Sequence, residues 1–88
     1  MSEDQTNADE ALALGAIGWT LSDDARAERF LALTGLTPET LRAALGERTT
    51  LAAALRFLEA HEPDLVACAE ALGVKPAALP EARRRLEA

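Results

Sequence analysis

Apolar residues recur along this chain at intervals of three and four positions, the spacing of an amphipathic helix, and glycine or proline interrupts them repeatedly. The first run, from Leu12 to Trp19, is apolar almost all the way round, which predicts a central helix over about residues 7–20, buried on more than one side. Gly15 and Gly18 each cost such a helix about 1 kcal/mol relative to alanine. We therefore expect another helix, in the same chain or in a partner, to approach closely at these glycines.

Capping and stop signals divide the rest of the chain into further short helices. The predicted caps are Ser22, Asp23 or Asp24 for the second helix, Thr37 with Pro38 for the third, and Thr49 or Thr50 for the fourth. Gly35, Gly46 and Gly73 are predicted helix ends, and the His61-Glu62-Pro63 segment separates the fourth helix from the fifth. Pro80 cannot sit inside a helix that starts at Pro76, so we expect a turn over residues 76–79 and a last helix from Pro80.

The same order of signals occurs twice, 38 residues apart. The matched residues, first half and then second, are Ile17, Trp19, Asp24, Gly35, Leu36, Pro38 and Leu41, and Leu55, Phe57, Glu62, Gly73, Val74, Pro76 and Leu79. This echo predicts an all-α fold, a compact bundle of five to six short helices built from two pseudo-repeated helix-turn-helix units over about residues 12–46 and 50–86. We expect Ile17 and Trp19 to meet Leu55 and Phe57 near the centre of one shared core.

Composition supports a single small domain over residues 7–88, preceded by an acidic tail, residues 1–6, that we expect to be disordered. The chain has 88 residues and a formal net charge of −6, with an isoelectric point of about 4.6. That charge repels phosphate backbones and anionic lipid surfaces, so nucleic acid and membranes are disfavoured partners. A single cysteine, Cys68, excludes an intramolecular disulfide and fits a reducing, cytoplasmic compartment.

Two segments resemble a known family. The run Arg-Phe-Leu-Ala-Leu-Thr-Gly-Leu-Thr-Pro-Glu-Thr-Leu-Arg, residues 29–42, is similar to the signature of small alphaproteobacterial proteins known only as domain of unknown function family 3572. Residues 51–64 resemble that family's second conserved segment, and the similarity extends to about Leu79. The sequence departs from the expected pattern at Ala25, where an Asp-Pro turn is anticipated. The resemblance implies an all-α fold and brings no catalytic or binding residue with it.

Candidate chemistry along the chain is sparse. His61, Glu62, Asp64 and Cys68 are the only cluster of possible metal ligands, but their spacing suits a metal poorly and Cys68 falls on an apolar stripe. The adjacent acids Asp23 and Asp24 are better explained as helix caps than as paired catalytic carboxylates. The three arginines at residues 83–85 suit contacts with the chain's own acidic helices, with an acidic partner as the alternative. We therefore expect no enzyme activity, no cofactor and no small-molecule substrate.

The leading functional hypothesis is a protein-interaction or structural module that self-associates. Five apolar residues fall outside the main stripes and so exceed what one core needs; they are Leu14, Ile17, Leu21, Leu33 and Val66. The predicted interaction surface comprises Gly15, Gly18, Leu33, Arg42 and Val66. The alternative is a helix-turn-helix DNA-binding regulator that uses residues Gly35 to Leu45, although Arg42 is the only basic residue in that segment.

Overall fold

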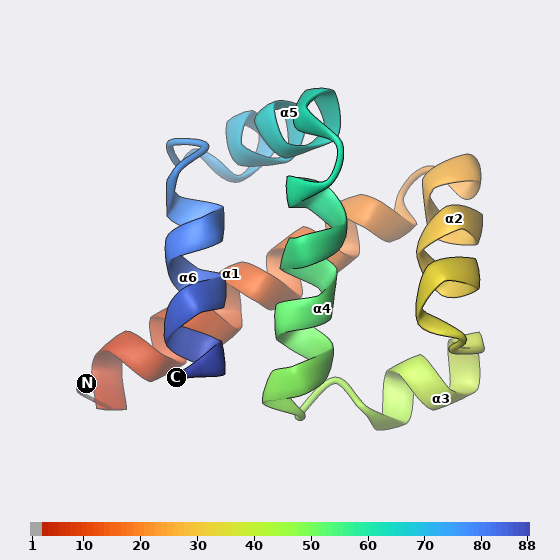
Figure 1. The fold of residues 1–88 in the computed structure, drawn as a ribbon, viewed down its shortest axis with the longest axis horizontal. Helices are drawn as coiled ribbons and strands as arrows, with labels where there is room; N and C mark the ends of the chain where they lie inside the picture. Colours follow the sequence, from red (N-terminus) through yellow and green to blue (C-terminus); the bar gives the residue numbers. More distant parts are fainter. Residues whose placement is uncertain (1–2) are drawn as a thin grey trace.

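A computed structural model of the chain describes residues 3–88, and these form six α-helices and no β-strand (Figure 1). The helices are α1 (Glu3–Leu21), α2 (Asp24–Thr34), α3 (Pro38–Ala43), α4 (Arg48–Glu59), α5 (Glu62–Leu72) and α6 (Ala78–Glu87). The prediction of an all-α bundle of five to six short helices is confirmed. None of the helices described over residues 3–88 is both long and apolar enough to cross a membrane.

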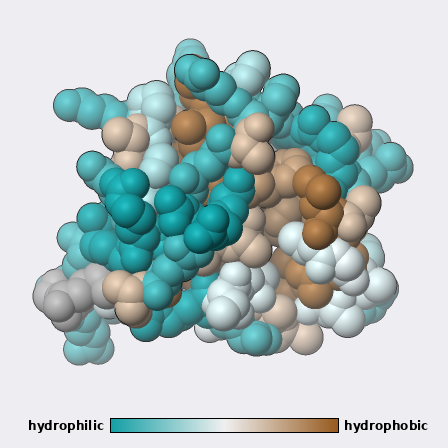
Figure 2. Space-filling view, in the orientation of Figure 1, coloured by the Kyte–Doolittle hydropathy of each residue, from teal (hydrophilic) through white to brown (hydrophobic). Residues whose placement is uncertain are grey.

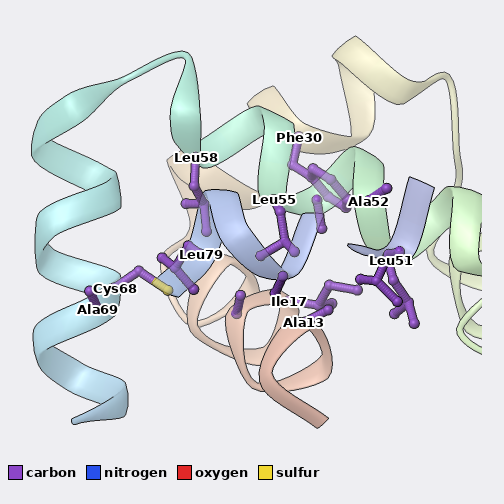
Figure 3. Close-up of a cluster of buried hydrophobic side chains, with 14 of the residues drawn as sticks. Ala13, Ile17, Phe30, Leu51, Ala52, Leu55, Leu58, Cys68, Ala69 and Leu79 are labelled. Atoms are coloured by element: carbon purple, nitrogen blue, oxygen red, sulfur yellow. The ribbon is translucent and has the colours of Figure 1, made fainter. Parts of the chain in front are cut away.

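The core lies where α1, α4 and α6 meet. These three helices make the most extensive contacts with one another, and α5 packs across α1 and α4. Figure 3 shows the inward side chains, with Ile17 and Ala13 of α1 below Leu55 of α4, and Leu79 of α6 between them and Cys68 of α5. Leu55, Cys68 and Leu79 are completely buried. One continuous cluster thus joins both halves of the chain.

The helices α2 and α3 form an arm beside this core. In Figure 1 they descend and return at the side of α4, away from α6, and α3 makes only minor contacts with the other helices. Phe30 anchors the arm, because its fully buried ring packs edge-on against Phe57 of α4 with the centroids 5.4 Å apart. Leu41 is the one buried residue of α3. The two chemically similar halves therefore pack differently, since α6 is central while α3 is peripheral.

The predicted local signals around the arm are confirmed except at Gly46, because α3 ends at Ala43 with Ala44 as its C-cap, before that glycine. Asp23 caps α2 by accepting a hydrogen bond from the backbone N–H of Arg26, 2.9 Å away. Thr37 and Thr40 form a reciprocal capping box at the start of α3, with Pro38 in the first turn. Gly35 and Gly73 end α2 and α5 with φ of 73° and 71°, the left-handed conformation that a side chain would strain. At Gly73 the next amide, of Val74, also bonds back to Ala69, which completes a Schellman turn.

Three helix starts differ from the sequence expectations. The first helix begins at Glu3, so residues 3–6 of the predicted tail are helical, and Met1 and Ser2 lie outside the described residues. The fourth begins at Arg48 after Glu47, which provides no side-chain cap, rather than after a threonine. The sixth begins at Ala78, with Pro80 in its first turn. A proline is accommodated there because first-turn amides have no partner within the helix.

Two side-chain placements also differ. Ile17 was expected near the centre and was also counted among the surplus apolar residues; it is 3% exposed and belongs to the core, so the first expectation is confirmed and the second is wrong. Trp19, expected at the centre, is only partly buried, and the guanidinium carbon of Arg26 lies 3.6 Å from its ring centroid. Arg26 also donates a 2.7 Å hydrogen bond from Nη2 to the carbonyl oxygen of Trp19. This cation–π contact and hydrogen bond tie the start of α2 to the end of α1.

Candidate interaction surfaces

An apolar groove runs between the arm and α4. It has a volume of about 460 Å³ and is lined by Leu33, Thr34, Leu36, Thr49, Thr50, Ala53, Arg56 and Phe57; we call it the α2–α4 groove. Figure 2 shows hydrophobic side chains gathered over the space between α4 and α2, beside a hydrophilic area over α6. Leu33 projects at its edge with 76% of its surface exposed, the largest value among the large hydrophobic residues of 3–88.

The cations beside this groove are already matched with acids of the same chain. Arg56 donates two hydrogen bonds to the carboxylate of Glu87, at 2.6 and 3.0 Å. Arg29 lies 5.6 Å from the Phe57 ring centroid and forms an ion pair with Asp64 at 2.9 Å. The groove is therefore flanked by neutral pairs of charges even though the whole chain is strongly acidic.

A second depression lies between α1, α2 and α3. It has a volume of about 280 Å³ and is lined by Ile17, Leu21, Ala27, Leu31, Pro38, Leu41, Arg42 and Leu45; we call it the Arg42 pocket. Seven of these eight side chains are apolar. Arg42 is exposed and forms no ion pair with any other residue of 3–88. The pocket thus combines an apolar wall with one uncompensated cation.

The five residues predicted as an interaction surface do not form one patch. Leu33 lines the α2–α4 groove, Arg42 lines the pocket named after it, and Gly15 lies in a third depression between α1, the end of α5 and α6. Val66 is 41% exposed on α5, and Gly18 is exposed on α1. The apolar periodicity identified exposed residues but could not place them on a common face, because that placement depends on how the helices pack.

The two α1 glycines have different surroundings. A Cβ atom built on Gly15 would lie 3.3 Å from Cδ2 of Leu72, so this glycine admits α5 close to α1, as expected. A Cβ on Gly18 would meet nothing within 4 Å, so the expected close approach is absent there within residues 3–88. Because the contact with α5 of the same chain accounts for a glycine at position 15, no partner protein is needed to explain Gly15.

Most of the basic residues near the C-terminus contact the chain's own acids, as predicted. Arg83 bridges Glu59 of α4 and Glu87 of α6. These hydrogen bonds, with Glu59 foremost, raise the pKa of Arg83, and the pKa of Glu87 is lowered chiefly by hydrogen bonding to Arg56. Arg84 is exposed and forms no ion pair within the described residues. The network fastens α6 to α4.

Asp9 is the buried charge that sequence reasoning missed. It is 2% exposed and accepts two hydrogen bonds from Arg85, at 2.9 and 3.0 Å. The Gln5 side chain donates a third, at 3.1 Å. Hydrogen bonding to Asp9 raises the pKa of Arg85. No local pattern reports this pair, because its members are 76 positions apart.

The candidate metal or thiol cluster is divided between surface and core. His61 Nδ1 lies 3.0 Å from Asp64 Oδ2 at the exposed start of α5, whereas Cys68 is completely buried. Burial raises the pKa of the Cys68 thiol to about 11, which keeps it protonated near neutral pH. Over residues 3–88, no three His, Cys, Asp or Glu side chains are grouped to hold a metal ion. Cys68 is thus a core residue of the kind the apolar stripe predicts.

The helix-turn-helix-like segment lacks a basic face. Its second helix, α3, has six residues, and its exposed charged side chains are Glu39 and Arg42, one acid and one base. A recognition helix normally supplies several contacts to phosphates and base edges. This charge balance gives the segment little attraction for a phosphate backbone.

The fold and its surface together define a class, that of small all-α proteins whose apolar depressions are bordered by short helices. Within this class, the chain belongs to the family described as Protein of unknown function (DUF3572), whose model matches residues 6–88. No curated protein matches the chain, and no solved structure does so either.

Proposed function

We propose that this protein is a protein-interaction module that self-associates through the α2–α4 groove. The observation that carries the proposal is the position of Leu33, a leucine 76% exposed at the edge of an apolar groove on the same face. A surface with a projecting side chain beside a groove is self-complementary. When two copies are related by a two-fold axis, each can insert its leucine into the groove of the other. Burial of an exposed leucine is favourable by about 1.5–3 kcal/mol per side chain.

The charge arrangement supports contact between two identical surfaces. Two copies of a chain with a net charge of −6 repel each other at long range. At the groove, however, Arg56 is paired with Glu87 and Arg29 with Asp64, so identical faces can meet without bringing unpaired like charges together. Threonines 34, 49 and 50 line the same groove and supply hydroxyl groups for its polar edge.

The same proposal assigns the protein a binding role rather than an enzymatic one, in the cytoplasm. Two partly or fully buried carboxylates are committed to structural ion pairs, Glu59 with Arg83 and Asp9 with Arg85. The buried Cys68 thiol suits a reducing compartment, where a single cysteine stays unpaired.

Sedimentation velocity of the full chain over a range of micromolar concentrations tests the proposal. The native protein should show a concentration-dependent shift towards a dimer, and Leu33→Asp should sediment as a monomer. Val66→Asp is the matched control, since Val66 is an exposed apolar residue on α5, outside the groove. A native protein that stays monomeric, or a Val66→Asp effect as large as that of Leu33→Asp, would overturn the proposal.

A further inference from the structure

The Arg42 pocket differs in chemistry from the α2–α4 groove. The groove contains three threonines and an arginine that is already paired with Glu87. In the pocket, Arg42 is the only lining residue with a polar side chain, and this cation has no acidic partner within residues 3–88. Its apolar wall is continuous with the core, because Ile17 and Leu41 are 3% and 4% exposed.

These properties complement one type of molecule. An apolar wall excludes ligands rich in hydrogen-bonding groups, because each such group would lose water without gaining a protein partner. The aliphatic part of Arg42 lines the pocket and its side chain is exposed, so an unpaired guanidinium is available at the pocket mouth. It favours a single anionic oxygen-bearing group, and a carboxylate accepts two parallel hydrogen bonds from it. The complementary ligand therefore has an aliphatic body and one carboxylate end.

The size of the pocket narrows the ligand further. Its volume of about 280 Å³ is just below the range of about 300–1,000 Å³ typical of small-molecule sites. A hydrocarbon chain of medium length is small enough for this space. The strongly acidic average charge of the protein disfavours anions in general, so binding must draw chiefly on the apolar wall, with Arg42 selecting the end group.

We propose that the Arg42 pocket binds a medium-chain fatty acid, with its hydrocarbon chain against Ile17, Leu31 and Leu41 and its carboxylate at the Arg42 guanidinium. This inference is independent of self-association. Leu31 and Leu33 are two positions apart on α2 and line different depressions, so they lie on different sides of the helix. One site can therefore be altered while the other is left intact.

Titration of the full chain with octanoate, decanoate and octanol tests the ligand class, at neutral pH and low salt, with NMR chemical shifts or calorimetry as readout. Decanoate should bind about fifteenfold more tightly than octanoate, since each added methylene contributes about fourfold. Octanol, which has the same chain length without the charge, should bind about two- to fivefold more weakly than octanoate.

Arg42→Ala should weaken octanoate binding at least to the level of octanol, because the acidic protein repels a carboxylate that has lost its cation, and should leave octanol binding unchanged. Arg84→Ala is the matched control, because Arg84 is also exposed and forms no ion pair within the described residues. Equal binding of octanoate and octanol to the native protein, or equal effects of the two substitutions, would refute the role of Arg42.

Filling the pocket tests the location. Ala27 lines it on α2, whereas Ala32 on the same helix is exposed and outside it. Ala27→Phe should abolish decanoate binding and Ala32→Phe should preserve it, with circular dichroism confirming that both variants are helical. If Ala27→Phe is unfolded, the arginine variants decide the question. Absence of decanoate binding to the native protein at millimolar concentration would overturn the proposal.

Discussion

Gly15 and Gly18 lie about one turn apart in α1, and their different surroundings give opposite expectations for the same substitution. Gly18 has open space where a Cβ would stand, whereas Gly15 faces Leu72 at 3.3 Å. Both glycines carry the same penalty for a helix interior, about 1 kcal/mol relative to alanine. Only at Gly18 can that penalty be removed without displacing a neighbour.

We therefore expect Gly18→Ala to raise the free energy of unfolding by up to about 1 kcal/mol, which corresponds to a melting temperature about 4–8 °C higher in a domain of this size. Gly15→Ala should give a smaller gain or a loss, because Leu72 must shift. Urea unfolding followed by circular dichroism measures both changes. A destabilised Gly18→Ala variant in dilute solution would contradict this account.

The buried thiol of Cys68 should make the free energy of unfolding fall as the pH rises through the alkaline range. Its pKa is about 11 in the folded chain and 9.0 when unperturbed, chiefly because burial disfavours the thiolate. Between these values the folded state holds the proton more often than the unfolded state. The contribution of the protonated thiol to stability is therefore complete below pH 9.0 and is lost as pH rises through 11.

The measurement is the difference in unfolding free energy between the native protein and Cys68→Ala across this pH range. That difference should be constant below pH 9.0 and should shift against the native protein as the pH approaches 11. Groups common to both proteins cancel in the comparison. A difference that does not change with pH would mean that Cys68 is not held in a desolvated environment.

At the level of elements, the sequence predicted several helix caps and stops correctly, but it did not predict which helices pack against each other. Gly35, Gly73, Asp23 and the Thr37-Pro38 pair act within one turn of their own positions, so a local reading could find them. The pair of Asp9 with Arg85 depends on the meeting of α1 and α6, which no local spacing encodes. The start of α6 was also beyond a local interpretation. Pro80 could be the first residue of the helix or lie within its first turn, and the choice depends on the conformation of the backbone before it.

The Asp9–Arg85 pair predicts an asymmetry between two substitutions. Arg85→Ala should destabilise the fold more than Asp9→Asn, because the first leaves a carboxylate that is 2% exposed without its cation. The second leaves an arginine whose side chain is 39% exposed and can turn to water. Thermal unfolding of both variants beside Arg84→Ala, which should resemble the native protein, measures the effect. Equal losses would mean that Asp9 is hydrated after Arg85 is removed.

At the scale of the whole molecule, stability should be unevenly distributed. The core helices α1, α4 and α6 contact one another extensively, whereas α3 has six residues and few contacts outside the arm. The hydrophobic periodicity predicted one bundle, but it could not distinguish the central sixth helix from the peripheral third, since each repeats a similar short apolar pattern. The two candidate depressions were missed for the same reason, because both arise where the arm stands beside the core.

Native-state hydrogen exchange should reveal this division. Local opening of the arm should make the amides of α3 and of the last turn of α2 exchange fast. They should exchange faster than the other helical amides from the second turn of α1 to the end of α5. Amides of α4 at Leu55 and Leu58 should exchange only on global unfolding, since both side chains are fully buried. Equal protection in α3 and α4 would show that the arm and the core open together.

The contact between α1 and α6 also sets when the chain can complete its fold. Asp9 and Arg85 are separated by almost the whole sequence, so a large loop must close before they meet. During synthesis on the ribosome, α1 emerges before α6, so its core side chains stay exposed until Leu79 and Leu86 of α6 can pack against them. The core therefore stays incomplete until α6 has emerged, and until then the buried side chains of α1 are available to a chaperone.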